Sequence, residues 1–187
     1  MVISKKFATL FLVAFSATTF AADESAKPNP VVVNGGTVHF TGELVNAACA
    51  VNTDSSNQTV DLGQYRTARL AAAGDKTTPV PFQIKLVDCD PTVQATAAVA
   101  FYGRTVENNS NLLTVSSGGN ATAAQNVGIE VSDDSSKVLN FGGEDFSTSK
   151  KLNEGTNVLN FSARYVATGQ STPGLANADS TFVVKYE

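Results

Sequence analysis

The chain has 187 residues, a formal net charge of −4 and only 16% charged residues. Its 13 Lys and Arg residues are scattered along the sequence, whereas a nucleic-acid-binding surface needs them clustered. The composition therefore argues against a nucleic-acid partner and is typical of a β-rich surface protein with many turns.

The first 21 residues have the pattern of a secretory signal peptide. Lys5 and Lys6 give a positive start, residues 7–15 are almost wholly apolar, and small residues precede a cleavage point after Ala21. The apolar run is shorter than the roughly 20 residues that span a bilayer. We therefore expect residues 1–21 to be removed and the protein to be secreted through the periplasm without a membrane anchor.

A β-branched stretch, residues 31–40, follows the Pro-containing lead of residues 22–30. Three consecutive valines favour an extended backbone, and each proline of the lead pushes the residue before it in the same direction. Asn34-Gly35 is also a strong signal for a two-residue hairpin turn. The local pattern leaves three possibilities open: a first hairpin, an edge strand, and an arm that adds itself as a strand to another molecule.

Alternating polar and apolar residues predict a series of short strands. Residues 80–88 are the clearest case, because Phe82, Ile84 and Leu86 share one face. Residues 95–102 are apolar on both faces and predict a central strand. The other expected elements are strands at 37–46 (continuing extended through 47–51), 58–62, 112–115, 127–131, 138–141, 157–165 and 181–187, and a helical turn within 67–73. About nine strands with almost no helix predict an antiparallel β-sandwich.

Cys49 and Cys89 are the only cysteines of the chain. In an oxidising compartment such a pair predicts a disulfide, which would stabilise the fold by roughly 3–4 kcal/mol in the chain-entropy model. Free thiols and metal ligands are the alternatives, but two Cys with one distant His make a poor metal-binding set. We expect a disulfide, with no metal and no cofactor.

The sequence lacks the residues from which catalytic sites are usually built. Its single His is His39, and no Gly-x-Ser-x-Gly motif holds a nucleophile. The carboxylate pairs Asp133-Asp134 and Glu144-Asp145 lie in predicted turns, where Asp commonly hydrogen-bonds the backbone. We therefore expect that the protein is not an enzyme.

Six sequence blocks and the C-terminal pattern carry a resemblance to a known family. The blocks are, in order, residues 33–40 (VNGGTVHF), 45–51 (VNAACAV), 62–67 (LGQYRT), 88–90 (DCD), 163–165 (ARY) and 176–179 (ANAD). Gly174 with Tyr186 matches an end signature. Together the blocks closely resemble the pilins of the chaperone–usher class from Gram-negative bacteria, specifically the major subunit of type 1 fimbriae. Any single block is weak, but the ordered set covers nearly the whole mature chain.

The resemblance implies an immunoglobulin-like antiparallel sandwich that lacks its final strand, in residues 41–187, and an N-terminal donor-strand arm, in residues 22–40. A periplasmic chaperone would lend a strand beside the groove strand. At the outer-membrane usher, the arm of the next copy would replace that strand. The groove strand is expected to present Phe182, Val184 and Tyr186, with Gly174 preceding them. The product would be a head-to-tail filament of identical subunits at the cell surface, the fimbrial rod, whose tip carries separate adhesin and adaptor subunits.

The arm has two possible registers, because successive side chains of an extended strand point to opposite sides. The side chains expected to enter the groove are those of Val31, Val33, Gly35 and Thr37. Burying the two valines would contribute roughly 3–6 kcal/mol. The lead of residues 22–30 is longer and richer in Pro than the family pattern, so the opposite parity, with Val32 and Val38 inward, is the alternative.

Two other functions fit the sequence less well. A minor tip or adaptor pilin of the same system would share the fold, and its copy number per rod would separate it from the main subunit. A stand-alone carbohydrate-binding sandwich usually exposes aromatic side chains, and this chain has no Trp. Glycan binding by the isolated subunit would revive that third possibility.

Overall fold

The computed structural model describes residues 29–187, and the predicted signal peptide lies outside them. The chain divides into two units, with the boundary between Gly42 and Glu43. Residues 29–42 contain no helix and no strand. Within residues 29–187 all the regular structure belongs to Glu43–Glu187, and none of its helices is long and apolar enough to cross a membrane.

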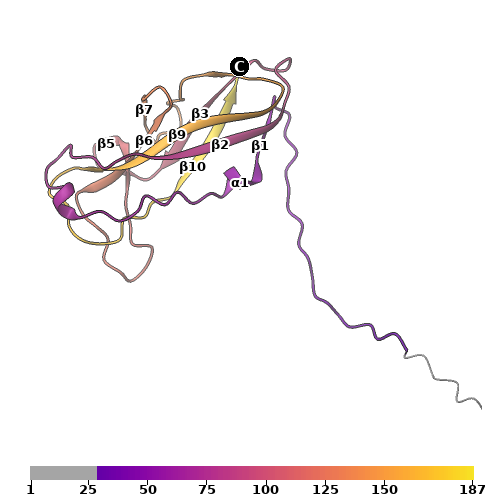
Figure 1. Cartoon of the computed structure of the whole chain (residues 1–187), viewed down its shortest axis with the longest axis horizontal. Helices are drawn as coiled ribbons and strands as arrows, with labels where there is room; N and C mark the ends of the chain where they lie inside the picture. The colour runs from indigo at the N-terminus through magenta and orange to yellow at the C-terminus, as the bar shows by residue number, and fades with distance from the viewer. Residues whose placement is uncertain (1–28) are drawn as a thin grey trace, which may run out of the picture. The chain divides into compact units, whose positions relative to one another are not determined.

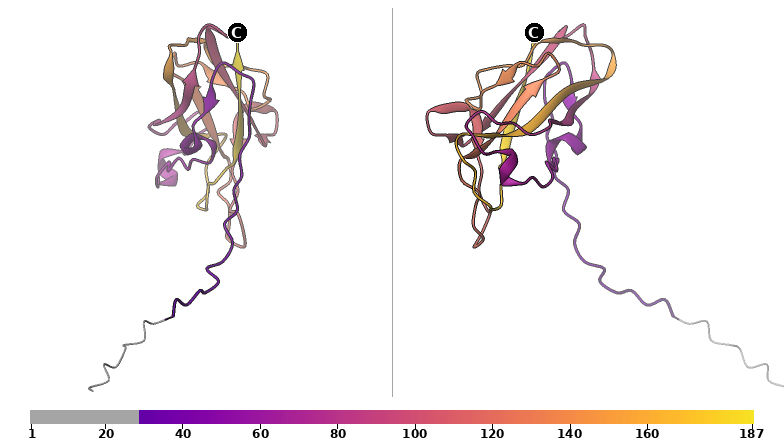
Figure 2. Two further views of the ribbon diagram at one scale, coloured as in Figure 1. Left: turned by 90° about the vertical axis from the view of Figure 1, so that its right-hand side faces the viewer. Right: turned by 60° about the vertical axis from the view of Figure 1, so that its left-hand side comes forward.

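The unit Glu43–Glu187 is a sandwich of two antiparallel β-sheets (Figure 1). The larger sheet has the order β1-β2-β9-β6-β5-β4, with β7 paired to β6, and the smaller has the order β10-β3-β8. In the left view of Figure 2 the yellow β10 and the gold β9 lie in opposite layers. The elements are β1 (Ala50–Val51), α1 (Thr53–Ser56), a 3-10 turn (Thr67–Arg69), β2 (Val80–Cys89), β3 (Thr96–Gly103), β4 (Thr105–Val106), β5 (Asn109–Thr114), β6 (Val127–Asp133), β7 (Val138–Leu139), β8 (Lys150–Lys151), β9 (Gly155–Ala167) and β10 (Ser180–Tyr186). The predicted antiparallel sandwich is confirmed.

The core forms where the alternating strands turn their apolar faces inward. On β2, Ile84 and Leu86 are fully buried, and they pair across the sheet with β9, whose Leu159 and Phe161 are also buried. Strand β3 is buried on both faces, from Ala97 to Phe101. The prediction of a central strand there is confirmed, because β3 has neighbours on both of its edges.

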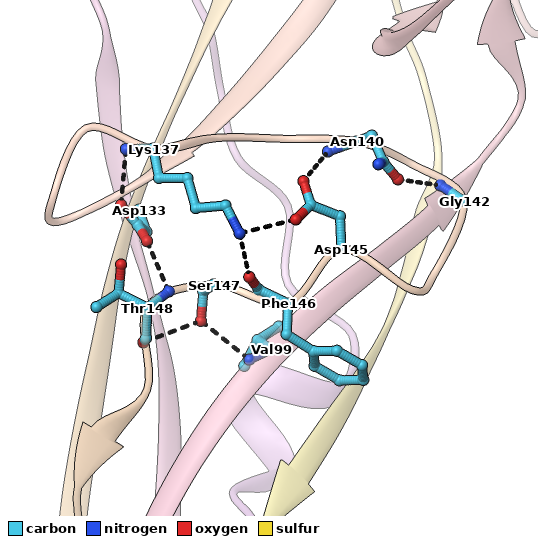
Figure 3. Close-up of polar contacts among 9 residues, drawn as sticks. All are labelled: Val99, Asp133, Lys137, Asn140, Gly142, Asp145, Phe146, Ser147 and Thr148. Atoms are coloured by element: carbon cyan, nitrogen blue, oxygen red, sulfur yellow. Dashed lines mark hydrogen bonds and ion pairs between the residues drawn. The ribbon is translucent and has the colours of Figure 1, made fainter.

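The second edge of β3 is completed by residues 140–151, which we call the flanking segment (Figure 3). Phe141 accepts a hydrogen bond from Gly103 N at 3.2 Å. Ser147 exchanges two hydrogen bonds with Val99: its backbone N donates to Val99 O at 2.8 Å, and its Oγ accepts from Val99 N at 3.0 Å. Strand β8 then pairs with the start of β3. The flanking segment therefore acts as a neighbouring strand in several short pieces.

Two carboxylates anchor the flanking segment to the turn after β6 (Figure 3). Asp133 is buried and accepts hydrogen bonds from Thr148 N at 2.8 Å and from Lys137 N at 2.9 Å. Asp145 pairs with Lys137 Nζ at 2.7 Å. For Asp133, burial raises the pKa, but the hydrogen bonds from the backbone outweigh burial and hold the pKa below its usual value. The predicted role of these acidic turns, bonding the backbone, is confirmed for Asp133.

A second buried carboxylate, Glu130 on β6, is held by two cations. Lys76 Nζ lies 2.8 Å away and the Arg164 guanidinium on β9 lies 2.6 Å away. Burial acts to raise the pKa of Glu130, but the hydrogen bonds and positive charges of Lys76 and Arg164 outweigh it, so the pKa lies below its usual value. Glu130 is therefore a paired buried charge that contributes stability only when it is ionised.

Two strands predicted from alternation are wrong. Neither residues 37–46 nor residues 58–62 form a strand, and only Ala50–Val51 is paired in the extended stretch that follows the first of them. In 58–62 the alternation did predict burial correctly, since Val60 is half-buried, Asp61 exposed and Leu62 buried. Alternation reports which side chains are covered, but a strand also needs a partner for its backbone. The structure adds three short elements that the sequence pattern did not indicate, namely α1, β4 and β8.

Candidate functional site

The C-terminal strand β10 is paired on one edge only. Its neighbour is β3, in a continuous register that runs from Ser180 opposite Gly103 to Tyr186 opposite Ala97. No strand of the described residues lies on the other side of β10. We call that side, along Ser180–Tyr186, the open edge.

The hydrogen-bond pattern shows which backbone groups face the open edge. Just beyond β10, Glu187 and Thr96 exchange two backbone hydrogen bonds, of 3.1 Å and 2.8 Å. Residue pairs along an antiparallel ladder alternate between hydrogen-bonded and non-hydrogen-bonded. The backbone groups of Phe182, Val184 and Tyr186 therefore point away from β3. Each of these three residues presents one N–H and one C=O to the open edge.

The side chains of the same three residues point into the sandwich but are only half-buried. The Phe182 ring packs at 6.3 Å from that of Phe101. Tyr186 Oη donates a hydrogen bond to Cys49 O at 3.2 Å, and burial raises the pKa of its phenol. Such partial burial contrasts with the neighbouring β3, which is buried from Ala97 to Phe101. The open edge thus combines unpaired backbone groups with incompletely covered apolar side chains.

A second edge lies at β1 in the opposite sheet. Asn52 N donates to Lys85 O at 2.9 Å, so the backbone groups of the neighbouring Val51 point away from β2. Cys49, just before β1, is bonded to Cys89 at the end of β2, as the sequence predicted. Tyr186 reaches this edge through its contact with Cys49 O.

Aromatic side chains of both sheets form the apolar layer beside the open edge. The Phe101 ring lies 5.3 Å from Phe161 and 6.2 Å from Phe82. On β2, Phe82 and Val80 face the core like Ile84 but are only half-buried. The sequence placed Phe82 on the core face but did not predict that its ring is only half-buried. The exposure of a side chain beside the open edge depends on the absence of a covering strand, which the local sequence pattern does not report.

The described part of the N-terminal unit, residues 29–42, exposes apolar side chains but has no sheet edge of its own. In residues 29–42 neither the hairpin nor the edge strand is present, and the large apolar side chains are exposed. The exposed fractions of Val31, Val32, Val33, Val38 and Phe40 are 85%, 94%, 77%, 73% and 92%. Gly35 and Thr37 are exposed as well. An exposed apolar segment without its own secondary structure is suited to adding itself to a sheet edge.

Gly174 lies outside β10, in the loop before it. A Cβ at this position would come within 2.4 Å of Ala124 N and 2.5 Å of the Ala123 carbonyl carbon. The neighbouring Leu175 exchanges backbone hydrogen bonds with this loop, donating to Thr122 O and accepting from Ala124 N. Gly174 therefore permits close packing of two loops, and it lies in the loop before β10, where the sequence placed it; its part in the groove stays a prediction.

The described residues contain no cluster of three or more His, Cys, Asp or Glu side chains that could hold a metal ion. His39 is exposed and makes no side-chain hydrogen bond within residues 29–187. What the open edge offers chemically is recognition of an extended peptide through its backbone and its alternate side chains.

A family model described as "Fimbrial protein" matches residues 38–187. The chain belongs to the fimbrial protein family. Similar proteins include a type-1 fimbrial protein, A chain, from Salmonella typhi, 59% identical over 87% of this chain and 89% of that protein. A fimbrial subunit type 1 from Salmonella typhimurium is 58% identical over 89% and 91% of the two chains. A type-1 fimbrial protein, A chain, from Escherichia coli is 47% identical over 97% and 100%.

Two solved structures share the fold of this fimbrial protein. The P pilus rod subunit PapA is 25% identical, with a TM-score of 0.63 over 75% of this chain and 100% of that one. A subunit in the structure of a chaperone–usher pilus is 27% identical, with a TM-score of 0.69 over 85% and 100%. The predicted immunoglobulin-like sandwich is confirmed by these likenesses together with the sheet order.

Proposed function

We propose that the chain is the structural subunit of a type 1 fimbrial rod and that it polymerises by strand addition. The N-terminal arm of one copy, within residues 22–40, pairs with the open edge of the next copy. The observation that carries this proposal is the unpaired edge of β10, where Phe182, Val184 and Tyr186 present free backbone groups and half-covered side chains.

The energetics favour a stable contact. Three outward-facing residues of β10 offer up to about six hydrogen bonds, each contributing about 0.5–1.5 kcal/mol net. Burial of Val31 and Val33 adds roughly 3–6 kcal/mol. Gly35, which lacks a Cβ, lets the arm approach the aromatic layer closely. Each copy gives its arm to one neighbour and receives an arm from another, so the contact is heterologous and builds an open filament.

The same open edge explains why assembly needs helper proteins. An unpaired edge with apolar side chains beside it is a template for aggregation. A periplasmic chaperone would protect the edge by lending a strand to it, and the outer-membrane usher would exchange that strand for the arm of the next copy. The rod would extend from the cell surface and carry adaptor and adhesin subunits at its tip. In this function the protein supports adhesion and is not an enzyme.

Deletion of the arm tests the proposal. A mature chain without residues 22–40 keeps the open edge, and we expect it to bind the chaperone but to form no rods in electron micrographs. Normal rods from this variant would refute the proposal.

A pair of substitutions tests the register of the arm. We expect Val33→Asp to abolish assembly, because it places a charge against the aromatic layer, while Val32→Asp leaves rods intact because that side chain faces away. If Val32→Asp abolishes assembly and Val33→Asp does not, strand addition still holds, but the arm has the alternative register with Val32 and Val38 facing inward. Assembly by both variants would contradict insertion of this stretch altogether.

A further inference from the structure

Asn34 and Gly35 form the only Asn-Gly pair of the chain. They lie in the N-terminal unit, outside any helix or strand, and both residues are exposed. Asn34 Oδ1 accepts a hydrogen bond from Gly36 N at 3.1 Å. This contact folds the Asn34 side chain back over the backbone that follows it, as in an Asx turn.

That local geometry favours a well-defined reaction. Because the Asn34 side chain is folded toward the peptide that follows it, its carbonyl carbon, Cγ, has the orientation from which it can approach the backbone nitrogen of Gly35. The hydrogen bond from Gly36 N withdraws electron density from the Cγ carbonyl, which makes Cγ more electrophilic. Nothing lies within 4 Å of the position that a Cβ of Gly35 would take, so ring closure meets no steric obstacle.

We propose that Asn34 is a site of spontaneous deamidation in the unassembled chain, and that insertion of the arm into a filament protects it. The second half of this inference rests on the proposed function. The Gly35 nitrogen bonds to Asn34 Cγ, and the side-chain amide leaves as ammonia, taking up the proton that the Gly35 nitrogen releases. One water then opens the five-membered succinimide at either carbonyl and leaves aspartate or isoaspartate at position 34. Nothing is oxidised or reduced.

Strand pairing suppresses this reaction for a geometric reason. In an extended strand the Asn34 side chain stands away from the following peptide, so Cγ cannot reach the Gly35 nitrogen. The reaction then requires local opening of the paired arm, and its rate falls by the population of the open form. A subunit in a filament is protected, whereas one that waits unassembled is not.

The product also disables the arm. Isoaspartate routes the main chain through the side-chain carbon and so lengthens the backbone between positions 34 and 35 by one carbon. The side chains of Val31 and Val33 then lose their phase with those of Gly35 and Thr37, as in a register slip. Deamidation would therefore remove aged subunits from the pool that can be added to a rod.

The test compares one site in two states of the mature protein. Freshly purified subunits and intact sheared filaments are incubated in the same mildly alkaline buffer, and peptide mapping by mass spectrometry follows deamidation at position 34. Asn126 serves as an internal reference, because its side chain donates to Gln170 O at 2.9 Å and the bulky Val127 follows it. We expect Asn34 in the free subunit to react at least about tenfold faster than Asn126 and at least about tenfold faster than Asn34 in filaments.

A matched variant separates the chemical claim from the functional one. Asn34→Gln lengthens the side chain, so the corresponding ring closes slowly; its subunits should assemble when fresh and stay competent on ageing, while wild-type subunits lose competence as isoaspartate accumulates. If Asn34 in free subunits reacts no faster than Asn126, the deamidation site is refuted. If it reacts fast and equally in filaments, the site stands, but protection by insertion, and with it the proposed place of the arm, is wrong.

Discussion

The backbone N–H groups of Phe182, Val184 and Tyr186 face the open edge, and this orientation predicts where a proline can be tolerated in β10. Pro lacks an N–H, so it is tolerated in an edge strand only where that N–H faces away from the sheet. The Val184 N–H faces the open edge, whereas the N–H of Lys185 points to β3. Val184→Pro should therefore leave the subunit folded but block strand addition, and Lys185→Pro should disrupt the fold itself.

The magnitude follows from the groups left without partners. Val184→Pro removes one hydrogen bond to the incoming arm, about 0.5–1.5 kcal/mol, and leaves the arm's carbonyl buried and unpaired, about 1–3 kcal/mol. The sum is about 1.5–4.5 kcal/mol, or between about 10-fold and 2,000-fold in affinity. Lys185→Pro instead leaves the carbonyl of Ala98, a buried residue, unpaired within the subunit.

The assay measures binding and folding separately. The full mature subunit is refolded with a labelled synthetic peptide of residues 22–40, and the affinity is read from fluorescence anisotropy. Urea unfolding without the peptide gives the stability of each variant. Wild-type affinity in Val184→Pro, or a loss of stability as large as that of Lys185→Pro, would refute the parity assigned to the open edge.

Three further outcomes are expected for the folded unit, each measured by urea unfolding. Replacing Cys49 and Cys89 by Ser should cost about 4 kcal/mol, because the disulfide closes a loop with a sequence separation of 40; an unchanged midpoint would contradict this. Gly174→Ala should cost about 1–3 kcal/mol by overpacking, and Gly169→Ala, whose Cβ would make only ordinary contacts, should cost clearly less. The pKa of Glu130 is lowered in the folded state, so its contribution to stability is present above the ordinary carboxyl pKa and is lost as the pH falls through the folded value. Glu130→Gln should reduce the stability by about 1–3 kcal/mol near neutral pH, a moderate amount because Lys76 and Arg164 are partly exposed. The variant should also lose less stability than the wild type as the pH is lowered.

Side-chain patterns predicted the strands that have partners. Alternation placed β2, β6, β9 and β10 within a few residues of their observed bounds, and a run that is apolar on both faces placed β3. In these strands the pattern of burial and the backbone pairing coincide, since each strand has a covered face and at least one hydrogen-bonded neighbour.

The same pattern failed where a segment buries its side chains but its backbone is not paired with a neighbouring strand. Residues 58–62 bury Leu62 but approach β2 through a side chain, with Gln58 Nε2 donating to Gln83 O at 3.1 Å. Gly174 was expected in the loop before the groove strand and lies there, but no sequence pattern indicated that it packs against Ala123 in another loop. A contact between distant loops leaves no local periodicity, so no local pattern could have placed it.

The disulfide has a mechanical consequence for a filament under tension. In a rod built by strand addition, a pull from the neighbour that holds the arm enters this unit near Glu43 and reaches Cys49 first. The covalent bond to Cys89 then carries the load directly to the end of β2, so the chain between the two cysteines, including β1 and α1, bears none of it. Traction on the rod can therefore not unravel that stretch, and its extension under load must come from elsewhere in the subunit or from the joints between subunits.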